Sequence, residues 1–520
     1  MATLTFHTRK QTVTLSAVPG ESVLTALQRA GVHELDAPCG GNGTCGKCLV
    51  RAEGALSPAG PEEAARLPQP GLRLACRCLV EGDCTVELPD DAAQAVVAVE
   101  GSGLSFPLTP ARGLGAAVDI GTTTVVLYLY DLSTGRRMAC RSGMNLQRAF
   151  GADVISRINH ANTAPRGLTQ MTQAIQGQLK DFLSAACEEA GCSPEQVVSI
   201  TVAGNTIMEH IFAGLSPASI AVAPFTPLSL FGGHQPGASV GLPGEVFLFP
   251  CVAGYVGGDI TAGLLSSGAY RAEQPVLFLD IGTNGEMAVG NREGFLTCAT
   301  AAGPAFEGAE ITCGMSGITG AVDQVWLEDG QVSCSVLGGG PPKGICGSGL
   351  VDALAVMLKL GAVDETGRLL PPDEAEDSAL PWLEEADDGV RFYLDRARTV
   401  FLTEGDVRKL QLAKAAVAAG IQTLLAKSGL SEDQVSALYL AGGFGSYIRQ
   451  ESAAAIGLFP ASLLDRIHPV GNSAGTGAAA CLLSRQARDD LAALTRSCTY
   501  LELSGCREFN DFYIECMMFE

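Results

Sequence analysis

The fold of most of this chain follows from one stretch, Ala117-Val-Asp-Ile-Gly-Thr-Thr-Thr-Val125. It reads as an apolar strand that reaches an aspartate, followed by a Gly-Thr turn and a second apolar strand. A second copy, Leu279-Asp-Ile-Gly-Thr-Asn-Gly-Glu-Met287, has the same order, and its aspartate lies 161 residues after the first (Asp119 to Asp280). The repeat predicts two related α/β lobes, each built around a strand-turn-strand unit.

An aspartate at a strand end followed by Gly-Thr is suited to bind ATP and magnesium. The carboxylate can hold the metal or its water shell, the glycine lets the turn approach phosphate, and hydroxyls and turn amides can donate to phosphate oxygens. A third glycine site follows a predicted helix over 404–425 and a predicted strand over 437–440, and it reads Ala441-Gly-Gly-Phe-Gly445. Because glycine has no Cβ, this turn can lie flat against an adenine–ribose unit. One copy alone would be an ordinary strand and turn, but the three sites together favour a nucleotide site.

A different kind of site lies near the N-terminus, in the loop Pro38-Cys-Gly-Gly-Asn-Gly-Thr-Cys-Gly-Lys-Cys48. Its three cysteines are separated by five and then two residues, and a fourth follows in Arg73-Leu-Ala-Cys-Arg77. Ferredoxins hold a 2Fe–2S cluster with such a loop and one distant cysteine. Predicted strands over 4–8, 12–17, 49–52 and 84–88, with a helix over 22–30, have the order of a β-grasp fold.

Composition limits the partners and the compartment. The chain has 520 residues, which predicts two to four domains, and a net charge of −22, which disfavours nucleic acid and anionic membranes as partners. No apolar run is long enough to span a membrane, and the first residues lack the apolar core of a signal peptide. We therefore expect the 18 cysteines to be cluster ligands and small buried side chains in a reducing cytoplasm, rather than disulfides.

Four further segments narrow the interpretation: Gly151-Ala-Asp-Val-Ile-Ser-Arg-Ile158, Val202-Ala-Gly-Asn-Thr206, Gly344-Ile-Cys-Gly-Ser-Gly349 and Gly471-Asn-Ser-Ala-Gly-Thr-Gly477. The three glycine sites, in their order, resemble those of the actin, sugar-kinase and heat-shock-chaperone ATPase superfamily. Joined to the cysteine loop, the whole set resembles the reductive activators of corrinoid proteins over essentially the full chain. In that family ATP hydrolysis drives an electron from the cluster to an inactive cob(II)alamin protein and restores cob(I)alamin.

The resemblance implies an α/β multidomain enzyme: a β-grasp 2Fe–2S ferredoxin domain at 1–90, a linker at 91–114, and a two-lobed actin-like (ribonuclease H-like) ATPase. Lobe I is expected at 115–272, and lobe II with a C-terminal extension at 273–520. The implied partners are a corrinoid protein of a methyltransferase system and an upstream low-potential electron donor, and dimers are common among such ATPases. The sequence leaves open which corrinoid protein, methyl donor and reductant are used, and the oligomeric state.

The same resemblance assigns roles to individual residues. Cys39, Cys45, Cys48 and Cys76 would hold the cluster, with Cys78 as an alternative to Cys76. Asp119 and Asp280 would flank Mg²⁺–ATP, and Glu286 is the candidate for positioning the hydrolytic water. The phosphate and nucleoside contacts would be Gly121, Thr122, Thr123, Gly282, Thr283, Asn284, Gly347, Ser348, Gly349, Gly442, Gly443, Phe444 and Gly445.

Three alternative functions use fewer of these features. An activator of a 2-hydroxyacyl-CoA dehydratase shares the ATPase architecture, but that class holds a 4Fe–4S cluster between two subunits. A redox-sensing protein with an inert nucleotide site would not need both Asp119 and Asp280, and a small-molecule kinase would not need the cysteine loop.

Two short patterns resemble other catalytic motifs. Gly41-Asn-Gly-Thr-Cys-Gly-Lys-Cys48 nearly matches a phosphate-binding P-loop, but Cys48 stands where the magnesium-binding Ser or Thr is needed. Gly471-Asn-Ser-Ala-Gly475 fits the nucleophile elbow of hydrolases, yet only His468 lies near it in the sequence. We expect the second pattern to be a glycine-rich turn that leads into a helix over 476–485.

Overall fold

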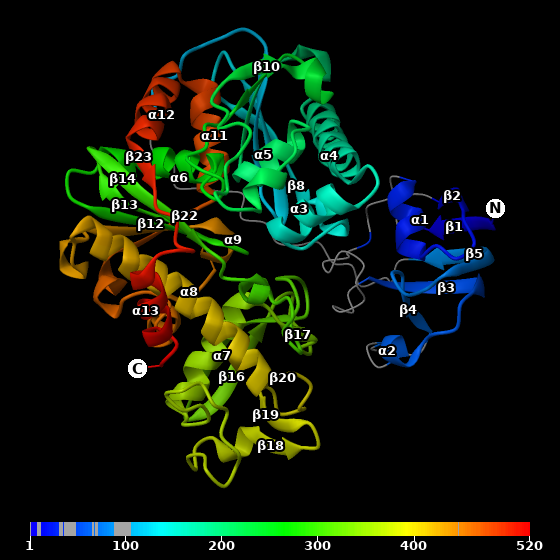
Figure 1. Cartoon of the computed structure of the whole chain (residues 1–520), viewed down its shortest axis with the longest axis vertical. Helices are drawn as coiled ribbons and strands as arrows, with labels where there is room; N and C mark the ends of the chain where they lie inside the picture. The colour runs from blue at the N-terminus through cyan, green and yellow to red at the C-terminus, as the bar shows by residue number, and fades with distance from the viewer. Residues whose placement is uncertain are drawn as a thin grey trace.

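The computed structural model describes residues 2–7, 12–30, 35, 48–64, 67, 71–87, 106–445 and 447–519. Within these ranges it contains an N-terminal sheet with one main helix, followed by two larger lobes (Figure 1). Cys39, Cys45 and most of the predicted linker lie outside the described residues. Each described helix is too short or too polar to cross a lipid bilayer.

The N-terminal sheet has the strand order β2-β1-β5-β3-β4. Strand β1 pairs antiparallel with β2 and parallel with β5, which agrees with the predicted β-grasp fold. Leu4 and Phe6 alternate with exposed or half-buried residues, and both pack with Leu27 of α1 in one core. The elements are β1 (Ala2–His7), β2 (Thr12–Ala17), α1 (Val23–Arg29), β3 (Leu49–Leu56), α2 (Pro61–Ala64), β4 (Leu72–Leu74) and β5 (Val80–Glu87).

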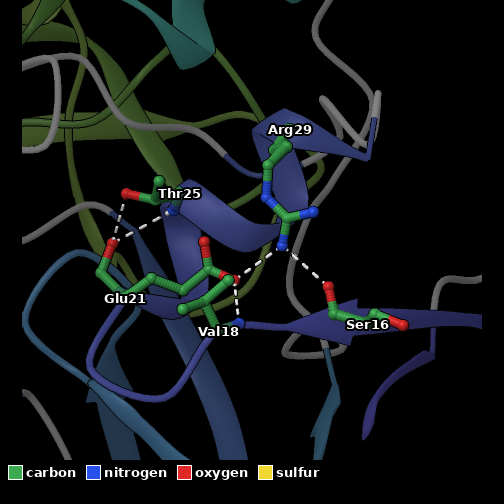
Figure 2. A network of polar contacts seen from close by, with 6 residues as sticks. Ser16, Val18, Glu21, Thr25 and Arg29 are labelled. Carbon is green, nitrogen blue, oxygen red and sulfur yellow. Dashed lines mark hydrogen bonds and ion pairs between the residues drawn. The ribbon is translucent and has the colours of Figure 1, made fainter. Parts of the chain in front are cut away.

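A network of polar contacts connects helix α1 to the end of β2 (Figure 2). Arg29 Nη2 donates to the carbonyl oxygen of Ser16 and to Glu21 Oε1, both at 2.7 Å. The same Glu21 oxygen accepts from the backbone N–H of Val18 at 2.6 Å. An exposed ion pair of this kind adds at most about 1 kcal/mol, so we infer that its main effect is to orient the helix that precedes the cysteine loop.

Lobe I is built on a six-stranded sheet of order β10-β11-β9-β6-β7-β8. Strand β6 pairs antiparallel with β7 and parallel with β9, so the first Asp-Ile-Gly-Thr copy lies where β6 turns into β7. The elements are β6 (Leu114–Ile120), β7 (Thr124–Asp131), β8 (Arg137–Met144), η1 (Leu146–Ala149), α3 (Val154–Thr163), α4 (Gly167–Glu189), η2 (Pro194–Gln196), β9 (Val197–Gly204), α5 (Thr206–Phe212), η3 (Ala218–Ile220), β10 (His234–Pro236), η4 (Gly237–Val240), β11 (Glu245–Leu248), α6 (Gly258–Ser267) and η5 (Ala269–Arg271).

Lobe II repeats this arrangement in a sheet of order β22-β21-β12-β13-β14-β23. Strand β12 pairs antiparallel with β13 and parallel with β21, as β6 does with β7 and β9. The predicted repeat of two related lobes is therefore confirmed. The sheet and its neighbours are β12 (Val276–Ile281), β13 (Gly285–Asn291), β14 (Gly294–Thr300), η6 (Pro304–Glu307), α8 (Glu404–Ser428), η8 (Glu432–Gln434), β21 (Ala437–Ala441), α9 (Gly442–Gly445), α10 (Gln450–Ala455), η9 (Ala461–Arg466), β22 (Ile467–Gly471), α11 (Ser473–Leu483), α12 (Arg485–Ser497), β23 (Cys498–Tyr500) and α13 (Arg507–Glu515).

Two small sheets, β16-β15-β17 and β18-β19-β20, are inserted between β14 and α8. Helix α8 begins after Thr403, whose side chain forms a reciprocal capping box with Asp406, and runs from the inserted part back to the main sheet (Figure 1). The inserted elements are β15 (Ala321–Glu328), β16 (Gln331–Val336), β17 (Gly344–Ile345), α7 (Gly347–Lys359), η7 (Leu380–Trp382), β18 (Leu383–Ala386), β19 (Gly389–Tyr393) and β20 (Phe401–Thr403).

Helices α6 and α11 share one core with residues from both six-stranded sheets. Their backbones approach closely because both helices carry glycine at the contact. A Cβ on Gly477 of α11 would collide with the carbonyl oxygen of Ala262, and a Cβ on Gly263 of α6 would lie 2.9 Å from Ser473 Oγ. This tight crossing joins the two lobes beneath the turns that carry the candidate site.

Candidate functional site

Four acidic side chains from four different elements meet where the two lobes join. Asp119 is near the end of β6, Asp280 is near the end of β12, and Glu286 lies directly opposite Asp280 in the β12–β13 register. Asp259, in the first turn of α6, completes the group. The first three are predicted from the sequence, and the structure brings them together. Asp259 was not predicted, because its Gly-Gly-Asp context resembles an ordinary helix start.

These carboxylates affect one another strongly. Burial raises the pKa of Asp280 to about 6. Burial and then the charge of Asp280 raise the pKa of Asp119 to about 7, against a hydrogen bond from Asn472, and the pKa of Asp259 to about 8. The pKa of Glu286 is also raised well above its ordinary value, by burial and then by Asp259 and Asp280. A bound cation would stabilise the ionised form of these carboxylates, so the cluster favours cation binding.

The donor set fits a hydrated magnesium ion better than a site made of protein ligands alone. In the described ranges, no three His, Cys, Asp or Glu side chains are arranged to hold a metal. Magnesium keeps several waters and is usually bound by one or two carboxylates together with substrate phosphates. Asp119 and Asp280 can fill that role if the phosphates come from a nucleotide.

The cluster predicts that stability depends on pH when magnesium is removed. The folded pKa values of Asp119 and Asp280, about 7 and about 6, lie above the ordinary value for aspartate. The folded state therefore holds extra protons, and the stability that they contribute is present below pH ~4 and is lost as the pH rises through the folded values. We expect the unfolding free energy in EDTA to fall between pH 5 and 8, with each proton contributing a slope of up to about 1.4 kcal/mol per pH unit.

Urea unfolding at several pH values measures this slope, and Asp119→Asn should reduce it. An equal slope in the variant and the wild type would contradict the assignment of the extra protons to this cluster.

Polar side chains form hydrogen bonds to the first turn, Gly121–Thr123. Asn145 Nδ2 donates to the carbonyl oxygen of Gly121 at 2.8 Å, and Arg157 Nη2 donates to that of Thr122 at 2.5 Å. Asn205 Nδ2 donates to Thr122 Oγ1 at 3.0 Å. Arg157 and Asn205 belong to two segments that sequence analysis singled out without assigning these contacts, and Asn145 was not identified.

A single carboxylate connects the first turn to the second. Thr123 Oγ1 donates to Glu307 Oε2 at 2.9 Å, and Thr283 Oγ1 donates to Glu307 Oε1 at 2.6 Å. The structure therefore places the two predicted phosphate turns on either side of Glu307. Asn284 instead turns toward the acidic group and donates to Glu286 Oε1 at 3.1 Å.

The Gly442–Gly445 segment directly follows β21 and lies beside Asp280. It forms the one-turn helix α9 rather than the flat turn that we expected. Gly442 has φ +87°, and a Cβ at this position would lie 2.5 Å from Asp280 Oδ1. A Cβ on Gly443, in contrast, would meet no atom within 4 Å. The protein's own packing and backbone therefore require glycine at position 442, whereas the space beside Gly443 is open.

This contrast yields a matched pair of variants. Gly442→Ala should lower the thermal unfolding midpoint, because it forces a side chain into the left-handed region and against Asp280. Gly443→Ala should leave the midpoint of the nucleotide-free protein within about 1 °C but weaken nucleotide binding if the nucleoside fills the open space. Thermal unfolding with and without nucleotide measures both effects, and equal midpoints for the two variants would contradict the contrast.

The Gly347–Gly349 segment forms the start of α7 and packs closely on its neighbours. A Cβ on Gly347 would collide with the carbonyl oxygen of Phe306, and Ser348 Oγ donates to the carbonyl oxygen of Asp323 at 2.8 Å. The Phe306 ring also lies 4.8 Å, centroid to centroid, from the ring of Phe444 in α9. Both predicted nucleoside segments therefore contact η6, the short helix that carries Glu307.

Two of the four predicted cluster cysteines are described, and they are in contact. Cys48 Sγ lies 3.3 Å from Cys76 Sγ, although 28 residues separate them in the sequence. Cys78 is buried like Cys48, and burial raises the pKa of its thiol to about 11. Two adjacent thiols fit the ligation of an iron–sulfur cluster, so the Cys48–Cys76 contact favours Cys76 as the fourth ligand.

The hydrolase-elbow pattern does not form a nucleophile site. Ser473 is buried at the start of α11, against Gly263 of α6. His468 is exposed on β22, and its ring lies beside that of Tyr439. The segment is a helix start, as expected, and the helix begins three residues earlier than the predicted one.

Comparison with known proteins divides the chain into three matched regions. Residues 6–81 match the family described as "2Fe-2S iron-sulfur cluster binding domain", and residues 114–272 match the "RACo middle region". Residues 274–520 match the "C-terminal domain of RACo the ASKHA domain".

Similar proteins span most of the chain. The "Corrinoid activation enzyme RamQ" of Eubacterium limosum is 36% identical over 418 residues, which cover 78% of this chain and 70% of that protein. The "[Co(II) methylated amine-specific corrinoid protein] reductase" of Methanosarcina barkeri is 24% identical over 77% of this chain and 76% of its own length. A solved structure, "Reductive activator for corrinoid,iron-sulfur protein", aligns with a TM-score of 0.71 at 31% identity, over 100% of this chain and 98% of that one.

Proposed function

Because the chain belongs to the family of reductive activators of corrinoid proteins, we propose that it passes an electron from a 2Fe–2S cluster to an inactive cob(II)alamin protein and uses ATP to drive the transfer. The observation that carries this proposal is the presence of two sites in one chain. The Cys48–Cys76 thiol pair lies in the ferredoxin-like domain, and the acidic group lies in the two lobes, with two Gly-Thr turns that both contact Glu307.

The proposed roles of Cys39 and Cys45 rest on the family resemblance, and those of the other residues rest on where their side chains lie. Cys39, Cys45, Cys48 and Cys76 hold the cluster, which supplies one electron at a time. Asp119 and Asp280 hold hydrated magnesium on the nucleotide, and Glu286 remains the candidate for positioning water. Burial and the charges of Asp259 and Asp280 raise the pKa of Glu286, and a bound cation would offset those charges. The phosphates lie on the turns Gly121–Thr123 and Gly282–Asn284, and the nucleoside lies near Gly347–Gly349 and Gly442–Gly445.

The need for ATP follows from the potentials. A plant-type 2Fe–2S centre has a potential of roughly −400 mV, and the cob(II)/cob(I) couple lies lower. A gap of ~150 mV corresponds to about 3.5 kcal/mol for one electron. A nucleotide can supply such an amount only if it binds two conformations with different affinity. We infer that ATP favours a complex in which the cobalt loses an axial ligand and becomes easier to reduce.

We assign the ferredoxin-like domain to 1–90, the linker to 91–114, lobe I to 115–272 and lobe II to 273–520. The matched regions at 6–81, 114–272 and 274–520 support these boundaries. The proposed setting is the cytoplasm, with a low-potential electron donor upstream and a corrinoid protein of a methyltransferase system downstream. A homodimer is proposed on the family resemblance.

An anaerobic assay tests the function. Reduced protein, magnesium, ATP and a cob(II)alamin protein are mixed, and the absorption band of cob(I)alamin is followed. We expect the band with ATP but not with a non-hydrolysable analogue, and a higher rate of ATP hydrolysis when the oxidised corrinoid protein is present. Equal hydrolysis rates with and without that partner would contradict the coupling, and reduction without nucleotide would contradict the role of ATP.

A further inference from the structure

Glu307 lies in none of the motifs of the sequence, yet it contacts both phosphate turns. Thr123 belongs to lobe I and Thr283 to lobe II, and both hydroxyls donate to the Glu307 carboxylate, at 2.9 and 2.6 Å. One carboxylate therefore spans the junction between the lobes. We call this the bridged arrangement.

The bridge uses hydrogen-bond donors that a phosphate on the turns would also need. A threonine hydroxyl has one hydrogen to donate, so Thr123 and Thr283 cannot donate to Glu307 and to a phosphate oxygen together. Carboxylate and phosphate are also both anions, and this junction already carries Asp119, Asp259 and Asp280. Like charges at short range repel, which makes joint occupancy unfavourable.

The segment that carries Glu307 is coupled to the rest of the site. It forms the short helix η6, and the neighbouring Phe306 stacks on Phe444 with ring centroids 4.8 Å apart. The carbonyl oxygen of Phe306 also lies where a Cβ on Gly347 would be. The segment that carries Glu307 therefore contacts both predicted nucleoside segments, α9 and the start of α7.

We propose that Glu307 is a latch: its carboxylate closes the two turns on each other, and the polyphosphate of a nucleoside triphosphate must displace it to bind. The proposal rests on the proposed function, because it requires that the turns bind phosphate. Glu307 acts through Thr123 and Thr283 and is thus a positioning residue. When nucleotide binds, the hydrogen bonds from Thr123 and Thr283 to Glu307 must therefore be broken in a separate step.

The test is calorimetric titration of the full-length protein with magnesium and a non-hydrolysable ATP analogue. Glu307→Gln retains the size of the side chain but removes its charge, so the analogue should bind about tenfold more tightly. This is the gain expected when a competing arrangement that is populated most of the time is removed. Glu310→Gln is the matched control, because Glu310 is an exposed acid three residues further along the same segment. It should bind like the wild type.

A second variant and a second measurement separate the latch from a structural role. Glu307→Asp keeps the charge but shortens the reach, so it should also bind the analogue more tightly. Both Glu307 variants should show a lower unfolding midpoint without nucleotide and a larger increase when the analogue is added. Unchanged or weaker affinity in both variants would overturn the latch while leaving nucleotide binding intact. Failure of the wild type to bind the analogue would overturn the proposed function itself.

Discussion

Cys76→Ala, purified without oxygen, is expected to lose nearly all of its 2Fe–2S cluster and with it the ability to reduce a cob(II)alamin protein. The sulfur of Cys76 lies 3.3 Å from that of Cys48, so the two thiols are already placed for a common cluster. A cluster of this type takes four cysteine thiolates, and removing one opens an iron site to water. Iron and sulfide analysis, with the visible absorption spectrum, measures the loss.

Cys78→Ala is the matched control, because it removes the same group two residues away. Cys78 is completely buried, and the thiol that lies against Cys48 is that of Cys76. This variant should keep the normal iron content and spectrum, at a cost of roughly 1 kcal/mol in stability from the lost packing. A Cys76→Ala protein with a normal spectrum, or a Cys78→Ala protein without one, would reverse the ligand assignment.

Asp280→Asn should lower ATP-dependent activation by about 10–100-fold, the range found when an outer-shell partner of a metal site is changed. Asp280 is central to the acidic group, since its charge raises the pKa of Asp119, Asp259 and Glu286. Neutralising it would remove the proposed contact to magnesium and would also lower the pKa of its neighbours. ATP hydrolysis as a function of magnesium concentration separates weaker metal binding from a slower chemical step.

The control for this variant is Asp329→Asn. Asp329 is exposed in the turn between β15 and β16, and its φ of +51° is one that asparagine accepts. The variant has the same change in net charge but should keep full activity. Normal activation by Asp280→Asn at every magnesium concentration would remove Asp280 from the nucleotide site.

The site residues that could be predicted from the sequence are those whose local sequence pattern indicates both the backbone structure and the ligand chemistry. Asp119 and Asp280 stand out because each ends a strand and precedes a Gly-Thr turn, and this local pattern determines both the backbone and the ligand chemistry. The β-grasp order was likewise readable from alternating strands, and its sheet is confirmed. The one-turn helix at Gly442–Gly445 was not expected, because four residues rich in glycine carry little local preference between a turn and a helix start.

Glu307 and Asp259 could not be found in the same way. Each is an isolated acid in a short helix or a first helical turn, where acidic residues are common for reasons unrelated to ligands. Their importance comes from long-range contacts: Glu307 meets Thr123, which is 184 residues away in the sequence. No local pattern encodes a contact of that kind, because it depends on how the two lobes are placed.

The crossing of α6 and α11 limits how this protein can change over evolutionary time. A methyl group added at Gly477 would collide with the backbone of Ala262, so it would disturb the packing between the two lobes. Because the colliding atoms include the carbonyl group of residue 262, which every amino acid carries, a smaller side chain on the opposite helix would not relieve the collision. We therefore expect position 477 to remain glycine in related chains that keep this crossing.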